Sequence, residues 1–191
     1  MPQSTNRFVW DGVVLLAVLN GNNGAEQSYL RGSDLSGSLS GAGGVGGLLA
    51  VNAGANGVHF VANDGNGNVS VLIDAASGAE SARYEYSPFG ETLRSTGPMA
   101  SVNSQRFSTQ FADDVTRRVK YLYREYVPEL GRWMTRDPIE ERGGLGLSTF
   151  VNNNPVLNTD AHGLILARPP VPRFGTSITS SKTPCQMVRT G

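Results

Sequence analysis

The sequence YLYREYVPELGRWMTRDPIEERGGLGLSTFVNNNPVLNTDAHGL, residues 121–164, carries the strongest structural signals in the chain. It contains two aspartates, Asp137 and Asp160, each followed by a turn-forming sequence. Between them lie a glycine pair at 143–144 and the run Asn-Asn-Asn-Pro at 152–155, which are strong chain-reversal signals. A chain that reverses twice over this distance can bring both carboxylates to one place.

Two carboxyl groups held close together share a proton, so that one acts as an acid and the other as a base near neutral pH. This pair is the one reaction centre that the residues themselves suggest. Each aspartate also has a structural interpretation. Asp137 precedes Pro138 and could simply start a turn, and Asp160 could cap the turn that follows it through an Asx hydrogen bond.

Composition narrows the class of protein. The chain has 191 residues, a formal net charge of +0, 24 glycines and only 17% charged residues. High glycine content with modest hydrophobicity favours many turns and short strands. Zero net charge does not favour nucleic-acid binding, and no run of about 18 apolar residues predicts a membrane span. The N-terminus lacks a basic region followed by an apolar core, so no signal peptide is expected in this chain.

Metal and cofactor chemistry is not predicted. The only cysteine, Cys185, cannot form an internal disulfide, and the two histidines, His59 and His162, lie far apart in the sequence. The glycine-rich stretch 41–47 lacks the Lys-Ser/Thr of a phosphate loop and the dinucleotide-binding pattern. It is expected to be a flexible connector that lets one strand cross closely over another.

A two-strand unit recurs along the chain. It consists of an apolar strand, a loop that begins with Asn or Asp and ends with Gly, and a return strand. Copies occur at residues 13–30 and 69–86, an offset of about 54 residues, which is typical of stacked supersecondary repeats. A third copy is predicted at residues 105–126, with a return strand over 118–126 that alternates with a period of two.

These patterns predict an all-β fold of successive antiparallel β-hairpins that form a curved sheet, with residues 133–164 folded back as an irregular, partly helical plug. We expect a hairpin region over residues 1–100, a core over 101–164 and a tail over 165–191. The tail is rich in Pro, Ser and Thr and shows no periodicity, so it is predicted to be disordered.

The same stretch resembles the core domain that closes RHS and YD-repeat proteins, large bacterial β-strand shells related to toxin C subunits and teneurins. The resemblance runs from about residue 7 to Leu164, and residues 83–93 resemble the YD repeat itself. The matching pieces are Tyr123-Arg124, Pro128-Glu129-Leu130-Gly131-Arg132-Trp133, Arg136-Asp137-Pro138-Ile139, Gly143-Gly144-Leu145, Asn153-Asn154-Pro155-Val156 and Asp160 with Gly163-Leu164.

The resemblance implies an internal aspartyl protease that cuts its own chain and frees a C-terminal toxin inside the shell. Asp137 and Asp160 are then the carboxylate pair, and the Leu164–Ile165 bond is the cleavage site. Arg124 stands at the arginine position of the family, where a guanidinium can clamp a carboxylate. No cofactor and no turnover of an external substrate are expected.

Other interpretations remain open at this point. Arg124 could be an alternating strand residue that points to solvent, and Trp133 with Leu130 is expected to serve packing. The chain could be a non-catalytic β-sheet scaffold or a cell-surface interaction module, a degenerate or truncated remnant of such a shell. An independent small-molecule enzyme has no supporting group of residues. The expected partner is the rest of a shell or a neighbouring chain at the open sheet edges, in a secreted or cell-surface system.

Overall fold

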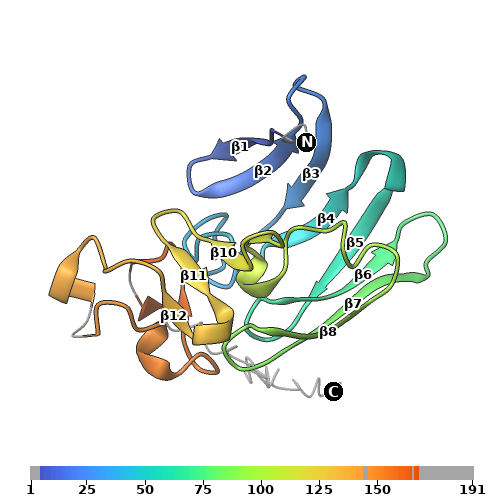
Figure 1. The fold of residues 1–191 in the computed structure, drawn as a ribbon. Coiled ribbons are helices and arrows are strands. Elements are labelled where there is room, and N and C mark those ends of the chain that lie inside the picture. Colours follow the sequence, from blue (N-terminus) through green and yellow to red (C-terminus); the bar gives the residue numbers. More distant parts are fainter. Residues whose placement is uncertain (1–4, 144–145, 165, 168–191) are drawn as a thin grey trace, which may run out of the picture.

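The main body of the protein is an eight-stranded antiparallel sheet in which the spatial order of the strands equals their sequence order (Figure 1). The structure is a computed structural model that describes residues 5–143, 146–164 and 166–167. The predicted all-β succession of antiparallel hairpins is therefore confirmed. The strands are β1 (Arg7–Asp11), β2 (Val14–Leu19), β3 (Ala25–Arg31), β4 (Leu48–Asn52), β5 (Val58–Asn63), β6 (Val69–Asp74), β7 (Glu80–Tyr86) and β8 (Thr92–Thr96).

The sheet is curved, and β1 to β3 turn away from the plane of β5 to β8 (Figure 1). Nearly every strand pair contains a register shift, for example between Val9 and Trp10 in β1 and between Ala62 and Asn63 in β5. A bulge adds a residue to one strand, bends that strand and increases the local twist. The repeated bulges therefore account for the curvature.

A second, smaller sheet lies beside the first (Figure 1). Its strand order is β12-β11-β10-β9. A third sheet, which has only the two strands β13 and β14, follows near the end of the described chain. These strands are β9 (Phe111–Asp113), β10 (Arg118–Lys120), β11 (Glu125–Val127), β12 (Arg132–Trp133), β13 (Thr159–Asp160) and β14 (Leu166–Ala167).

Helical structure in the described residues is limited to single 3-10 turns. They are η1 (Gly54–Asn56), η2 (Phe107–Thr109), η3 (Pro128–Leu130), η4 (Glu140–Gly143) and η5 (Val151–Asn153). Two of them, η4 and η5, lie in the segment that was expected to be irregular and partly helical. Apart from β14, the predicted disordered tail lies outside the described residues.

The first two copies of the repeat have the predicted structure, because their loops begin with a side chain that holds the turn. The Asn20 Oδ1 atom accepts hydrogen bonds from the backbone N–H groups of Asn22 and Gly24 at 3.0 and 2.9 Å. Asp74 accepts in the same way from the Ser77 N–H at 2.7 Å. These are Asx-type interactions that favour a reversal.

The prediction of a third copy of the two-strand unit at residues 105–126 is wrong. Residues 105–111 contain η2, in which Ser108 and Thr109 both have a φ of 52°. The expected strand 118–126 is split into β10 and β11, which pair with each other, and the Tyr121 N–H donates to the Arg124 carbonyl across the turn. The alternating pattern predicted one continuous strand here. The chain turns instead, because the side chains of Tyr121 and Arg124 are both buried.

The glycine-rich stretch makes the close approach that was expected, but it is a packed element instead of a flexible connector. The carboxylate of Asp34 accepts hydrogen bonds from the Ala42 and Gly44 N–H groups at 2.7 and 3.1 Å, and Val45 is fully buried. Gly43 lies at a φ of +64° against the carbonyl of Ala161, so close that a Cβ at this position would lie 1.8 Å from that oxygen.

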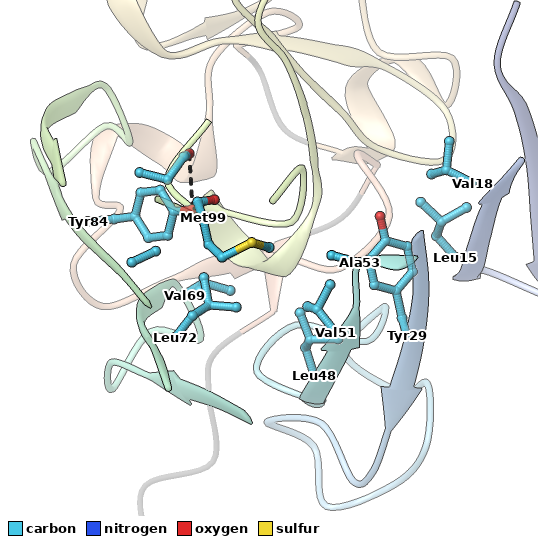
Figure 2. Packing of buried hydrophobic residues seen from close by; sticks show 12 residues of the cluster. Leu15, Val18, Tyr29, Leu48, Val51, Ala53, Val69, Leu72, Tyr84 and Met99 are labelled. Atoms are coloured by element: carbon cyan, nitrogen blue, oxygen red, sulfur yellow. Dashed lines mark hydrogen bonds between the residues drawn. The ribbon is translucent and has the colours of Figure 1, made fainter. Parts of the chain in front are cut away.

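Two apolar cores support the two sheets. The larger core lies on the eight-stranded sheet, where Tyr84 stands beside Met99 and donates its hydroxyl to the Ala100 carbonyl at 3.1 Å (Figure 2). The smaller core is largely aromatic, and Tyr86 packs against both. The buried members of the smaller core are Phe107, Val119, Tyr121, Tyr126, Trp133, Phe150 and Val151.

Two glycines in one loop allow the Gly43 contact to be tested. Gly37 also has a positive φ, +79°, but a Cβ there would meet nothing within 4 Å. We expect Gly37→Ala to cost about 1–2 kcal/mol of unfolding free energy, the penalty of a left-handed non-glycine residue. Gly43→Ala should cost roughly 1–3 kcal/mol more, because the added methyl displaces backbone. Urea denaturation of both variants measures the difference, and equal losses would contradict the close contact with Ala161.

Candidate active site

Arg124 lies at the centre of a buried charged cluster. The turn between β10 and β11 directs its side chain inward, where 3% of it is exposed. Its Nη2 atom is 2.9 Å from Oδ2 of Asp137 and 3.5 Å from Oδ2 of Asp160. The structure therefore brings together the three site residues that were predicted from the sequence. Arg124 does not point to solvent.

Asp137 is fixed by the turn that it starts. Its N–H donates to the Leu147 carbonyl at 2.9 Å, its Oδ1 accepts from the Ile139 N–H at 3.0 Å, and its carbonyl accepts from the Glu140 N–H at 3.0 Å. Pro138 has no N–H to place inside this turn. The turn interpretation is thus correct, and it leaves Oδ2 free to contact Arg124.

Asp160 is fixed by the loop that follows β13. Its Oδ1 accepts three backbone hydrogen bonds, from the N–H groups of His162, Gly163 and Leu164 at 3.1, 2.7 and 3.0 Å. Its other oxygen, Oδ2, faces Arg124, which also donates from Nε to the Gly163 carbonyl. The Asx cap predicted as the structural alternative is therefore present, and it coexists with the ion pair.

The electrostatics of this cluster are asymmetric, because one guanidinium serves two buried carboxyl groups. Burial raises the pKa of Asp160, although the Leu164, Gly163 and His162 N–H groups and the charge of Arg124 oppose the increase. Burial also lowers the pKa of Arg124, against the attraction of Asp137 and Asp160. The raised pKa of Asp160 favours the protonated form of this carboxyl group.

An aromatic wall covers the guanidinium. The Arg124 Cζ atom lies 4.2 Å from the centre of the Trp133 ring, within the range of a cation–π contact. Trp133 is buried in the aromatic core, as predicted, whereas Leu130 is 68% exposed and does not share this packing role. The ring contact therefore joins the charged cluster to the aromatic core.

A small cavity adjoins the carboxyl groups. Its volume is about 10 Å³, close to the minimum that admits one water molecule. It is lined by Arg124, Asp137, Gly146, Thr149, Val151, Asn152, Asp160 and Leu164. A water molecule, both acids and the residue before the predicted cleavage point can therefore share one space.

Two residues that line this cavity, Val151 and Asn152, belong to a stretch of unusual backbone. Val151, Asn152 and Asn153 have φ values of 40°, 53° and 55°, three consecutive left-handed residues without a glycine. Such a conformation is rare for a β-branched residue and costs on the order of 1–3 kcal/mol at each position. The sequence indicated a reversal near residues 152–155 but carried no signal for left-handed Val151.

The chain beyond Asp160 returns along β13. Asp160 pairs with Leu166, and Thr159 with Ala167, in the β13–β14 ladder. Leu164 lines the cavity, while Ile165, the other partner of the predicted cleavage site, lies outside the described residues.

His59 lies outside this site, and His162 contributes its backbone N–H group to Asp160. His59 is buried in the sheet, where Nδ1 lies 2.9 Å from the Ser81 hydroxyl and Nε2 lies 2.9 Å from the Asn56 carbonyl. His162 is half-buried in the turn after Asp160. Among the described residues no group of three or more His, Cys, Asp or Glu side chains is arranged to hold a metal ion.

The described part of the chain also has no helix with the length and apolar character needed to cross a bilayer.

Comparison with known proteins assigns the family. Residues 43–154 match the teneurin YD-shell family, and because the match spans more than half of the chain, the protein belongs to that family. It is 32% identical over 108 residues to the uncharacterized protein YibJ of Escherichia coli (strain K12), covering 56% of this chain and 46% of YibJ. It is 33% identical over 90 residues to toxin subunit YenC1 of Yersinia entomophaga, covering 44% of this chain and 9% of YenC1.

A third relative is salivary gland surface protein 1 of Aedes aegypti, 30% identical over 112 residues, of which the chain covers 3%. The chain thus spans less than half the length of these curated relatives. Among solved structures, it matches a crystal structure of TcdB2-TccC3-Cdc42 with a TM-score of 0.61 and 25% identity, covering 84% of this chain and 8% of that one. The Photorhabdus luminescens Tc holotoxin pore matches with a TM-score of 0.62 and 22% identity, covering 86% of this chain and 8% of that one.

The raised pKa of Asp160 predicts a defined pH dependence of stability. Above the ordinary pKa of the unfolded state, native Asp160 holds its proton longer than unfolded Asp160 does. Wild-type stability should therefore fall as pH rises from about 4 through the raised pKa. Asp160→Asn lacks this titration, so its free energy of unfolding should increase relative to that of the wild type as pH rises. Urea denaturation of both proteins between about pH 4 and 8 measures the difference.

Asp113 provides a control of opposite sign. Burial by itself would raise the pKa of Asp113. Hydrogen bonds from Thr116 and Val115 and the charge of Lys120 outweigh this effect and lower the pKa below its ordinary value. Asp113→Asn should therefore lose stability relative to wild type as pH rises through the acid range. Identical pH profiles for the two variants would contradict the assignment of a raised pKa to Asp160.

Proposed function

We propose that this chain is the C-terminal core of an RHS-type toxin-delivery shell and that it cleaves its own backbone after Leu164. The observation that supports this most is the meeting of Arg124, Asp137 and Asp160 around a cavity lined by Leu164. Membership of the YD-shell family and the similarity to toxin subunit YenC1 agree with a role in toxin delivery.

The reaction assigns different roles to the two acids. Asp137, which contacts Arg124 at 2.9 Å, acts as the base and takes a proton from water while the water oxygen attacks the Leu164 carbonyl carbon. Asp160, whose pKa is raised, donates its proton to the amide nitrogen that leaves. The C–N bond breaks with its electron pair on that nitrogen, which gives a new carboxyl group on Leu164 and a new amino terminus.

The geometry favours an intramolecular reaction. The Leu164 N–H donates to Asp160 at 3.0 Å, and the β13–β14 ladder holds the chain on the far side of the bond. A bond held beside its acid and base needs no association step, and fixed geometry of this kind supplies much of the rate in intramolecular reactions. The same arrangement explains why no external substrate is expected.

A second candidate function follows from the hydrogen bonds of Asp160. Three backbone N–H groups and Arg124 already use both of its oxygens, which is what a structural staple requires. In this case the cluster stabilises the loop without chemistry. The chain would then be a non-catalytic scaffold or a surface interaction module.

Association with further shell strands is part of either proposal. β1 and β8 lie at the two ends of the eight-stranded sheet, and all five residues of each are exposed. An edge strand presents unpaired N–H and C=O groups to another strand. We propose that the rest of a shell, or a neighbouring chain, pairs there as part of a secreted or cell-surface system.

Intact-mass measurement of purified protein tests self-cleavage. We expect a product that ends at Leu164 in the wild type, and a loss of at least about 100-fold in its rate of formation in Asp137→Asn and in Asp160→Asn, because each removes an acid or a base. The Asp113→Asn variant should cleave at the wild-type rate. Cleavage should also slow as pH rises above the raised pKa of Asp160, which must carry the proton.

Persistence of the full-length chain in folded wild-type protein, over days and across the acid-to-neutral range, would contradict self-cleavage and favour the scaffold. Cleavage that survives in both asparagine variants would contradict the assigned roles. Circular dichroism of each variant at the same pH shows whether the protein under test is folded.

A further inference from the structure

We infer that Asn152 supplies the hydrogen bond that stabilises the negatively charged oxygen formed on the Leu164 carbonyl during cleavage. This inference rests on the proposed self-cleavage and extends it by one residue. Asn152 lines the same cavity as Asp137, Asp160 and Leu164.

The chemistry requires a donor at this point. When water adds to the Leu164 carbonyl carbon, the π electrons of the C=O bond move to the oxygen, and a hydrogen-bond donor aimed at that oxygen lowers the barrier. The two acids do not meet this need, since Asp137 receives the proton from water and the proton of Asp160 is passed to the leaving nitrogen.

Most of the other polar groups around the cavity already have partners. Arg124 donates to the carbonyls of Gly163 and Leu147 and contacts both aspartates. The N–H groups of residues 162–164 donate to Asp160. Among the side chains that line the cavity, Asn152 and Thr149 remain as neutral donors, and an amide presents two N–H bonds where a hydroxyl presents one.

The backbone conformation separates these two residues. Asn152 stands in the middle of the three left-handed residues 151–153, while its predecessor Val151 is 4% exposed and packs in the aromatic core. The Val151 carbonyl accepts from the Asn154 N–H at 3.1 Å and from the Asn158 side chain at 3.4 Å, which holds the turn in place. Strained backbone of this kind persists where surrounding packing enforces it, and it clusters at functional sites. Here it places an exposed asparagine at the wall of the reaction cavity.

Two substitutions test the role of the side chain. Asn152→Gly removes the amide at a position where glycine adopts the left-handed conformation more readily than asparagine, so the fold is retained. We expect self-cleavage to slow by about 100-fold or more, the usual effect of removing one such donor. Asn152→Asp keeps the shape but lacks the N–H bonds. Its rate should recover as pH falls toward the ordinary pKa of aspartate, because the protonated carboxyl group again has a donor.

Asn153 is the matched control. It is the same residue type with nearly the same φ, 55°, and it is also exposed, but it lines a different hollow beside Leu130 and Gly131. Asn153→Gly should cleave at the wild-type rate. The recovery of Asn152→Asp at low pH is a result that a purely structural role of Asn152 would not produce.

The experiment separates this inference from the proposed function. Wild-type cleavage that is lost in Asp137→Asn but unchanged in Asn152→Gly would overturn the role of Asn152 and leave self-cleavage intact. Equal slowing in Asn152→Gly and Asn153→Gly would also overturn it, because the effect would then belong to the turn. If wild-type protein stays full-length, the proposed function fails, and this inference fails with it.

Discussion

The contact of one buried guanidinium with two buried carboxyl groups governs the C-terminal half of this structure. Arg124 ties together a turn of the smaller sheet, the Asp-Pro turn at residue 137 and the loop after Asp160. Burying charged groups is unfavourable unless they are paired and hydrogen-bonded, and one cation cannot neutralise two anions. The same contacts that hold the three segments together therefore also place two buried carboxyl groups beside each other.

The position of this cluster depends on packing between the two sheets. Tyr86 packs against the core of the eight-stranded sheet and against the aromatic core, and its hydroxyl donates to the Val69 carbonyl at 2.8 Å. The Tyr126 hydroxyl donates to the Phe89 carbonyl at 2.8 Å, which joins the smaller sheet to the turn after β7. Gly43 adds a third connection through its contact with Ala161. The site is therefore supported by residues from most of the chain length.

The sequence was sufficient for the hairpins, because the residues that start each loop act locally. Asn20 and Asp74 hold their turns with their own side chains, and such turns are readable without a tertiary structure. The convergence of Asp137 and Asp160 followed from reversal signals between them and from resemblance to a family. The break at residues 121–124 and the left-handed backbone of Val151 were not predictable. Both arise from burial against groups distant in sequence, which local periodicity does not encode.

The order of the eight-stranded sheet has a consequence for how the protein forms. Each strand pairs with the strand that precedes it in the sequence, so most ladders close only a short loop of chain, and the longest connection is residues 32–47 between β3 and β4. Closing short loops has a low entropic cost and favours fast folding, in contrast to sheets whose neighbours are distant in sequence. A nascent chain leaving the ribosome can therefore lay down this sheet one hairpin at a time. The cluster around Arg124 is completed only when the last of these residues has emerged, so assembly of the chain itself sets the moment at which the two acids first meet.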